Sequence, residues 1–320
     1  MGVRDGYRRA AMLGFALVVG AAAVTVAGCG GGAGDGARAV GGTPAEGASA
    51  AAGASGSPSP AAPASSAPAP STPAATGPAL RPELAEYVRK LPGTLGVQVR
   101  DRVTGATWQA GDTGFATWTA STIKLAIATA LLERNRAGAI TLGAGDRTTM
   151  RSMLVDSSNE ATDALWEKYD GVGMLPTFRE RYGMANLAVV AGYRPYWRHL
   201  QCSTTDLTAV MSYALDSLAA ADRAELVGWL RAAARSQPWG VWAAGAAQTP
   251  GHKPGWAFKP EGRPTHWVVH SVGFAGPGER YVVAVMYDLP KGHDAKAGAQ
   301  AVTNVVALAF GRPQVTVRGP

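Results

Sequence analysis

The sequence is poor in cysteine and in long apolar runs, and each shortage excludes a class of protein. Only two cysteines, Cys29 and Cys202, occur in 320 residues, so a disulfide-stapled scaffold is excluded. The apolar run Met12–Val26 is shorter than the roughly 20 residues that a membrane-spanning helix needs. We find no metal-ligand spacing, no phosphate-binding loop and no nucleic-acid signature. We therefore expect no metal, no cofactor and no nucleic-acid partner.

The first 29 residues have the order of an export signal. Three arginines in the first nine residues precede the apolar run, and two small residues precede Cys29. The segment Val26–Cys29 resembles a bacterial lipobox, in which the cysteine is lipidated and becomes the mature N-terminus. We expect 1–29 to be a lipoprotein signal peptide and Cys29 to anchor the exported protein to the outer face of the cytoplasmic membrane. An ordinary signal peptide or a transmembrane anchor is the alternative.

Residues 30–79 lack every aromatic residue and also leucine, isoleucine and methionine. Eight of the 21 prolines lie in this segment, among alanine, glycine and serine. Such a composition buries too little apolar surface to offset the chain entropy lost on folding. We predict a disordered, partly polyproline-like tether between the anchor and the rest of the chain.

Residues 80–320 have the length and composition of one globular domain. They contain all nine tryptophans, which we interpret as core residues, and we expect this domain to be monomeric. With Cys29 lipidated, Cys202 has no partner, so we expect a reduced, buried thiol. The net charge of +7 is compatible with adhesion to an anionic cell wall.

The predicted elements place strands at both ends of this domain and helices between them. This order predicts an α+β fold, with one antiparallel sheet, flanking helices and an all-helical lobe, and a cleft where the sheet meets the lobe. Helices are predicted from Pro82 onward, at 121–136, near 150–168, 174–182, 204–219 and 221–235, and at 294–310. Strands are predicted at 95–99, 107–109, 253–258, 266–274 and 281–288.

A serine and a lysine three residues apart begin the apolar helix at 121–136. On a helix this spacing places Ser121 and Lys124 on one face. A serine hydroxyl needs a base beside it to act as a nucleophile. Burial lowers the pKa of a lysine, so that a neutral Lys124 can accept the serine proton. An N-capping serine with an exposed lysine is the alternative, but the apolar surroundings favour a buried pair.

Two further motifs follow in order, Ser157-Ser158-Asn159 and Lys253-Pro254-Gly255. The order S-x-x-K, S-x-N and K-x-G is that of the penicillin-recognising serine enzymes. The chain resembles that family, and most closely its class A β-lactamase-like branch, over nearly all of residues 80–320.

The resemblance assigns a role to each motif residue. Ser121 would be the acylated nucleophile, Lys124 its base, and Ser157 the relay that protonates the leaving nitrogen. Asn159 and Lys253 would bind the substrate amide and carboxylate. At Gly255-Trp256, the Trp256 N–H would complete an oxyanion hole with that of Ser121.

Two departures from the family pattern bear on turnover. The glutamate that activates the deacylating water in class A enzymes is missing, because no glutamate lies between Glu180 and Glu225. His199 lies in the equivalent region, and we interpret it as structural or surface-exposed rather than as a substitute base. Pro254 replaces the usual threonine or serine, which removes a hydroxyl that would bind the substrate carboxylate.

These patterns predict a serine hydrolase that acts on β-lactams or related amides through an acyl-serine, with slow or absent turnover. Its partners would be a small-molecule or peptide amide, the membrane through the lipid anchor, and the cell wall. Two alternatives stay open: a non-catalytic relative that binds a peptide or wall fragment in the cleft, and a D,D-peptidase-like enzyme.

Overall fold

The computed structural model describes residues 82–259 and 266–320. The predicted signal peptide at 1–29 and the predicted tether at 30–79 lie outside the described residues, as do residues 80 and 81 at the start of the predicted domain. Those assignments remain predictions.

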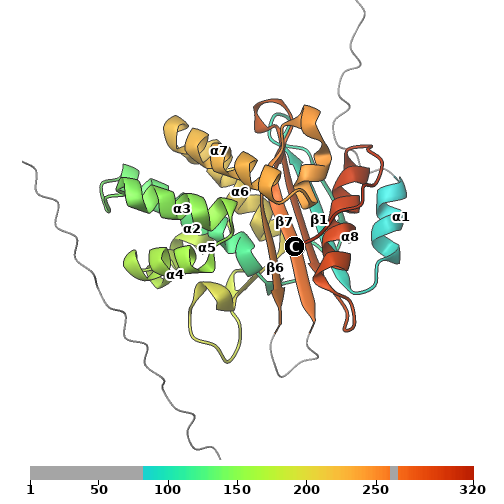
Figure 1. The fold of residues 1–320 in the computed structure, drawn as a ribbon, viewed down its shortest axis with the longest axis horizontal. Coiled ribbons are helices and arrows are strands. Elements are labelled where there is room, and N and C mark those ends of the chain that lie inside the picture. Colours follow the sequence, from blue (N-terminus) through green and yellow to red (C-terminus); the bar gives the residue numbers. More distant parts are fainter. Residues whose placement is uncertain (1–81, 260–265) are drawn as a thin grey trace, which may run out of the picture. The chain divides into compact units, whose positions relative to one another are not determined.

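The described elements follow the predicted order, with strands at both ends and helices in the middle (Figure 1). The α-helices are α1 (Pro82–Lys90), α2 (Lys124–Arg136), α3 (Ala144–Val155), α4 (Asn159–Lys168), α5 (Leu175–Glu180), α6 (Thr204–Ser217), α7 (Ala220–Ser236) and α8 (Ala295–Ala309). The strands are β1 (Thr94–Asp101), β2 (Thr107–Gly111), β3 (Thr117–Trp118), β4 (Ala188–Val189), β5 (Leu200–Cys202), β6 (Gly251–Phe258), β7 (Trp267–Ala275) and β8 (Tyr281–Asp288). Short 3₁₀ turns include η1 (Ala120–Ile123) and η3 (Trp197–His199).

The main sheet has five strands in the order β2-β1-β8-β7-β6, and every neighbouring pair is antiparallel. Strand β6 is therefore an edge strand, with one side open toward the helical lobe. A second sheet of very short strands, in the order β3-β5-β4, joins the segment before η1 to the segment before α6. The predicted α+β fold is confirmed.

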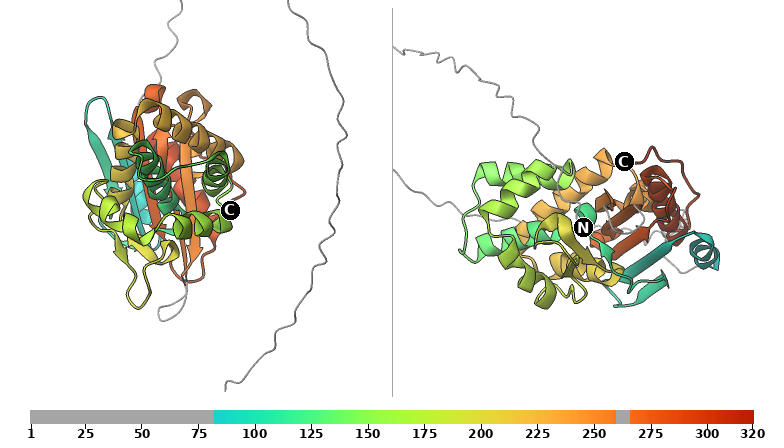
Figure 2. Two further views of the ribbon diagram at one scale, coloured as in Figure 1. Left: turned by 90° about the vertical axis from the view of Figure 1, so that its left-hand side faces the viewer. Right: turned by 90° about the horizontal axis from the view of Figure 1, so that it is seen from below.

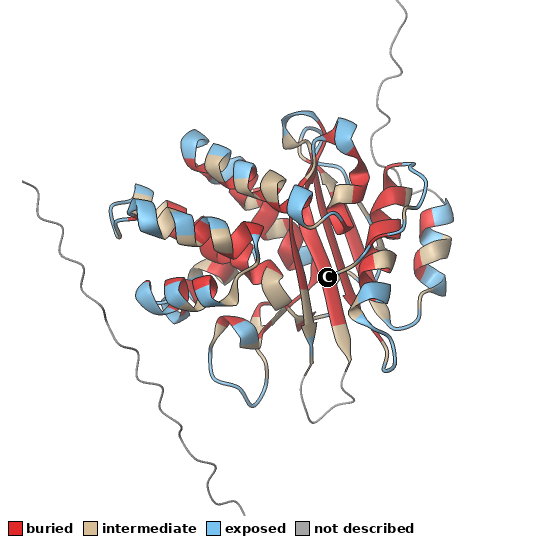
Figure 3. Cartoon of the chain, in the orientation of Figure 1, coloured by how far each residue is buried: buried red, intermediate tan, exposed pale blue. Residues whose placement is uncertain are grey.

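Helices cover both faces of the main sheet. Helices α1 and α8 lie on one face, and α2 to α7 form the lobe on the other (Figures 1 and 2). Strand β8 shows the consequence in its sequence. Val282, Ala284 and Met286 belong to the core shared with the lobe, whereas Val283 and Val285 belong to the core under α8. Side chains alternate between faces along a strand, so β8 is apolar almost throughout and buried along its whole length (Figure 3).

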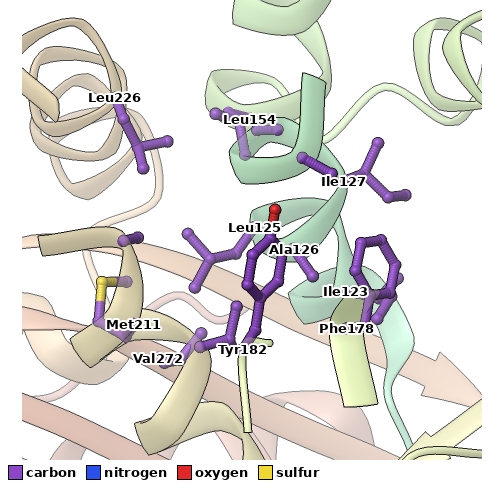
Figure 4. Close-up of a cluster of buried hydrophobic side chains, with 14 of the residues drawn as sticks. Ile123, Leu125, Ala126, Ile127, Leu154, Phe178, Tyr182, Met211, Leu226 and Val272 are labelled. Atoms are coloured by element: carbon purple, nitrogen blue, oxygen red, sulfur yellow. The ribbon is translucent and has the colours of Figure 1, made fainter. Parts of the chain in front are cut away.

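Helix α2 runs through the centre of the lobe. Residues Lys124 to Leu132 are all buried, and a helix that is apolar on every side is expected to be enclosed by others. Figure 4 shows this packing: Leu125 and Ile127 of α2 lie among Phe178, Tyr182 and Met211 from α5, the segment after it and α6. The first turn of α2 is thus held in place by the core.

Two predicted helices are broken where the chemistry is expected. The predicted helix at 121–136 begins within the 3₁₀ turn η1, whose first residue, Ala120, has a φ of 46°. The predicted helical region at 150–168 is two helices, α3 and α4, separated at Ser157, which has a φ of 58°. Positive φ is costly for residues other than glycine and is concentrated at functional sites. One of the two positive φ angles falls on the first residue of the S-x-N motif and the other directly before Ser121.

Candidate active site

Ser121 lies in η1, at the entry to the buried helix α2. In a 3₁₀ turn residues three apart are eclipsed, so the tighter turn keeps Ser121 and Lys124 on one face, as the sequence predicts. Among the described residues, the Ser121 hydroxyl makes no hydrogen bond, and it lies half-buried on the wall of a cavity. A hydroxyl in this position is accessible to a bound molecule.

The Lys124 side chain is completely buried and is surrounded by oxygen atoms. Its Nζ donates to the Ser157 carbonyl oxygen at 2.7 Å, to Asn159 Oδ1 at 3.1 Å and to the Ser158 carbonyl oxygen at 3.2 Å. No carboxylate accepts from it directly among the described residues. Burial, with a smaller contribution from the nearby Arg198 charge, lowers the pKa of Lys124 to about 7. A large fraction of this amine is therefore neutral near pH 7.

Ser157 connects the two lysines of the motif set. Its Oγ accepts from Lys253 Nζ at 3.0 Å and lies 3.5 Å from Lys124 Nζ. The left-handed backbone at Ser157 turns both its carbonyl oxygen and its hydroxyl toward the amines. Ser158 next to it caps α4 by accepting from the Ala161 N–H at 3.0 Å. The S-x-N motif is thus a strained turn held by a helix cap.

Lys253 is also completely buried, on the edge strand β6. Its Nζ donates to Ser157 Oγ and to the Pro254 carbonyl oxygen at 2.9 Å. Burial, together with the charge of Lys124, lowers the pKa of Lys253 well below its usual value. Two of the three N–H donors of a charged Lys253 are thus engaged within the protein.

Pro254 lies on the open side of β6. Its carbonyl oxygen accepts from a lysine side chain rather than from β7, and the N and carbonyl groups of one strand residue point to the same side. The missing N–H of Pro254 therefore costs no bond to β7, in keeping with the preference of proline for edge strands.

Gly255 allows β6 to approach η1 closely. A Cβ at this position would lie 2.9 Å from the backbone nitrogens of Ser121 and Thr122, a separation that real Cβ atoms do not tolerate. The close approach places the β6 backbone beside the Ser121 and Thr122 backbone nitrogens at the start of η1, of which the Thr122 N–H donates to the Thr119 carbonyl oxygen at 3.2 Å. Participation of the Ser121 and Trp256 N–H groups in an oxyanion hole stays a prediction.

We predict that Gly255→Ala destabilises the domain by about 1–3 kcal/mol, because the added methyl group forces two backbone segments apart. Gly228→Ala is the matched control. Gly228 is exposed in α7 and has open space at its Cβ, so its replacement should stabilise the helix by roughly 0.5–1 kcal/mol. Chemical denaturation measures both changes, and equal effects would contradict the close approach.

The cavity next to Ser121 has a volume of about 270 Å³ and is rich in aromatic side chains. Ser121 and Asn159 provide polar groups, and Arg198 and His199 provide nitrogen donors. The aromatic part of the wall consists of Trp118, Trp197, Trp256 and Phe258. Three tryptophans that the sequence suggested as core residues therefore line the site. A larger hollow of about 720 Å³ lies at the far end of α2, beside Glu133 and Asp222, and contains none of the predicted residues.

His199 lies on the cavity wall rather than at the surface alone. Its Nδ1 is 3.3 Å from the Arg194 carbonyl oxygen, and its ring packs against Tyr193 and Tyr196, with centroids 4.6 and 5.8 Å apart. A carbonyl oxygen only accepts, so this contact requires a proton on Nδ1. The ring is part of an aromatic cluster, in agreement with a structural role.

Trp197 and Asp163 are site residues that sequence reasoning missed. The Trp197 ring lies over Lys124, with Nζ 4.8 Å from the ring centroid. Its Nε1 donates to Asp163 Oδ1 at 2.7 Å. The only available signal was the aromatic stretch Tyr193–Trp197 in the region where the family glutamate was expected.

Cys202 is buried and unpaired, as predicted, and burial raises the pKa of its thiol. The described residues hold no cluster of three histidine, cysteine or acidic side chains suited to a metal ion. Within 82–259 and 266–320, no helix combines the length and apolar character needed to cross a membrane.

Comparison with known proteins places this geometry in context. No protein-family model matches the sequence. The chain is 30% identical over 227 residues to "Putative lipoprotein LppW" of Mycobacterium tuberculosis and of Mycobacterium bovis, covering 68% of this chain and 69% of LppW.

Solved structures with the same fold include class A β-lactamases. A reconstructed last common ancestor of the Gram-negative enzymes is 24% identical with a TM-score of 0.57, covering 72% of this chain and 97% of the ancestor. The β-lactamase from Desulfarculus baarsii is 18% identical with a TM-score of 0.56, covering 72% and 96%. The chain therefore belongs to the family of the mycobacterial lipoprotein LppW, and its fold is that of the class A β-lactamases.

Proposed function

We propose that this protein is an exported serine acyl-enzyme, acylated at Ser121 by β-lactams or by related D-alanyl amides. The observation that carries the proposal is the pair of buried lysines joined through the Ser157 hydroxyl. Ser121, three residues before Lys124, and Asn159 line one cavity. Two buried amines without a carboxylate partner are costly for folding. A catalytic role for the two lysines explains why they are buried despite this loss of stability.

Each motif residue has one step in the proposed reaction. Neutral Lys124 takes the Ser121 proton, and Oγ attacks the amide carbon. The carbonyl oxygen becomes an oxyanion next to the backbone N–H groups at the start of η1 and on β6. Ser157 then donates its proton to the leaving nitrogen as the C–N bond breaks, and it regains a proton from the adjoining lysine amines. Asn159, whose Oδ1 is bound to Lys124, has its amide nitrogen available for the substrate.

Location at the membrane is part of the same proposal. The name of LppW calls that relative a lipoprotein, and Val26–Cys29 of this chain resembles a lipobox. We propose that Cys29 carries the lipid and that 30–79 holds the catalytic domain away from the membrane. Transfer of the Cys29→Ala protein from the membrane fraction to the soluble fraction tests this part, and unchanged fractionation would exclude it.

Covalent labelling tests the chemistry. A fluorescent penicillin should label the full chain, and Ser121→Ala should abolish the label. Ser217→Ala is the matched control, because Ser217 is an exposed serine at the end of α6, and its labelling should equal that of the wild type. A wild-type chain that stays unlabelled at millimolar penicillin would refute the proposal.

We predict that the acylation rate rises with pH through the pKa of Lys124, which is about 7. Only the neutral amine accepts the Ser121 proton, so the rate should increase about tenfold between pH 6 and pH 8 and then level off. Stopped-flow labelling over this range gives the profile. A rate that is flat, or that falls with pH, would contradict the assignment of Lys124 as the base.

A binding protein without chemistry is the second candidate, and the aromatic cavity favours it. Four aromatic side chains next to Ser121 suit the capture of a peptide or wall fragment without bond cleavage. Such a protein would bind ligands equally well with alanine at Ser121 and would carry no covalent label. Turnover of any β-lactam or peptide amide that disappears in Lys124→Ala would exclude it.

A further inference from the structure

The segment between β4 and β5 closes over the catalytic lysine. It ends in η3, whose first residue, Trp197, is only 3% exposed. The indole covers the Lys124 amine at 4.8 Å from Nζ to the ring centroid. An aromatic ring therefore occupies the space next to the amine.

The indole is held in place by a hydrogen bond from its Nε1 to Asp163 of α4. The carboxylate accepts from Trp197 Nε1 at 2.7 Å, from the Tyr196 hydroxyl at 2.5 Å and from the Arg198 guanidinium at 3.1 Å. The same guanidinium lies 4.5 Å from the centroid of the Trp197 ring. Three donors from consecutive residues hold one carboxylate, so the ring cannot swing aside without breaking charge-assisted bonds.

Release of an acyl group from Ser121 as an acid needs a water molecule beside the acyl carbon. Water adds to the acyl carbon and gives a proton to a base. The ester C–O bond then breaks, and the proton passes to Ser121 Oγ, leaving a carboxylic acid and the free serine. A base must reach the water within hydrogen-bonding distance. The indole occupies the space over Lys124, its N–H is already bonded to Asp163, and it has no acceptor that could take a proton from water.

We propose that Trp197 keeps hydrolytic water from the acyl-serine, so that the protein retains its acyl group instead of turning over. This inference rests on acylation at Ser121. It makes Trp197 a positioning residue, whose proposed effect is on the lifetime of the acyl-serine. The protein would then act as a long-lived acceptor of β-lactam or D-alanyl acyl groups.

The test measures the lifetime of the acyl-protein. The full chain is acylated with benzylpenicillin, freed of excess by gel filtration, and followed by intact-mass spectrometry. Trp197→Gln, which is smaller and can hold water, should lose the acyl mass about tenfold faster or more, whereas Trp197→Phe keeps a ring in place and should release it near the wild-type rate. Trp108→Gln is the control, because Trp108 is a half-buried tryptophan on β2, at the opposite edge of the sheet.

A second measurement uses the wild-type protein and so does not depend on the folding of a variant. Hydroxylamine, a small neutral nucleophile, should remove the acyl group rapidly from denatured acyl-protein and slowly from native acyl-protein. Equal rates in the two states would overturn the proposal, as would a folded Trp197→Gln protein that releases its acyl group at the wild-type rate. Failure of the wild type to gain any mass would instead refute acylation itself.

Discussion

Lys124→Met is expected to abolish function and to stabilise the protein. The acylation rate should fall by about 10²–10⁴-fold, because the proposed base for Ser121 is lost. The free energy of unfolding should rise by about 2–4 kcal/mol at pH 7. An amine whose pKa falls from 10.5 in the unfolded chain to about 7 in the fold destabilises the fold by an amount set by that difference. Methionine has a similar volume and no charge.

The stability gained by Lys124→Met should also depend on pH. The folded pKa of Lys124 lies below the unfolded value, so the unfolded chain binds more protons between pH 7 and pH 10.5. The loss in the free energy of unfolding that is caused by burying Lys124 is largest below pH 7. It disappears as the pH rises toward 10.5. Urea denaturation at pH 6 and pH 9.5 should show a smaller difference between Lys124→Met and wild type at the higher pH.

Lys168→Met is the control for this prediction. Lys168 is exposed on α4 and pairs with Asp146 at the surface, where ion pairs contribute little. Its replacement should change stability by less than about 1 kcal/mol. A Lys124→Met protein that is less stable than wild type, or one that is acylated normally, would contradict a buried catalytic base.

The domain is expected to lose stability steeply between pH 6.5 and pH 4 because two histidines are buried in neutral form. Both are completely buried, and desolvation lowers the pKa of His252 to about 3 and that of His270 to about 4. In this range the unfolded chain binds protons that the fold excludes, so unfolding becomes easier as the pH falls. The loss for His270 alone is on the order of 3 kcal/mol.

The hydrogen bonds of His270 explain the penalty and define the test. Its Nε2 contacts the Trp118 carbonyl oxygen at 2.8 Å, and its Nδ1 accepts from the Tyr287 N–H at 3.2 Å. A second proton on the ring would remove that acceptor. His270→Gln should reduce the slope of stability against pH, whereas His293→Gln, at an exposed residue, should leave it unchanged. Equal slopes in wild type and His270→Gln would contradict the prediction.

The motif residues could be predicted from the sequence because their chemistry is local. Ser121 and Lys124 are three apart, and Ser157 with Asn159 and Lys253 with Gly255 form equally short patterns in a fixed order. The structure brings Lys124, Ser157 and Lys253 together with nitrogen–oxygen separations of 3.5 Å or less. The fold class followed from the order of strands and helices.

What the sequence did not predict depends on long-range packing. Trp197 contacts Lys124, which lies 73 positions earlier, and no periodicity shows such a contact. The helix break at Ser157 and the positive φ of Ala120 were missed for a related reason, since neither residue is a glycine or a proline that signals a turn. Tertiary contacts hold both residues at positive φ. Trp197 belongs to the core of the lobe and Trp256 packs against the core under α8, yet both also line the cavity. The sequence did not show this second role, because an aromatic cavity wall has the same composition as a core.

The central claim is a covalent bond to Ser121. Intact-mass spectrometry of the full chain after exposure to excess benzylpenicillin, followed by peptide mapping, measures it directly. We predict the addition of one penicilloyl group per chain, located on the peptide that contains Ser121 and persisting after removal of free penicillin. A chain that gains no mass, or one that carries the adduct on another residue, would contradict the account.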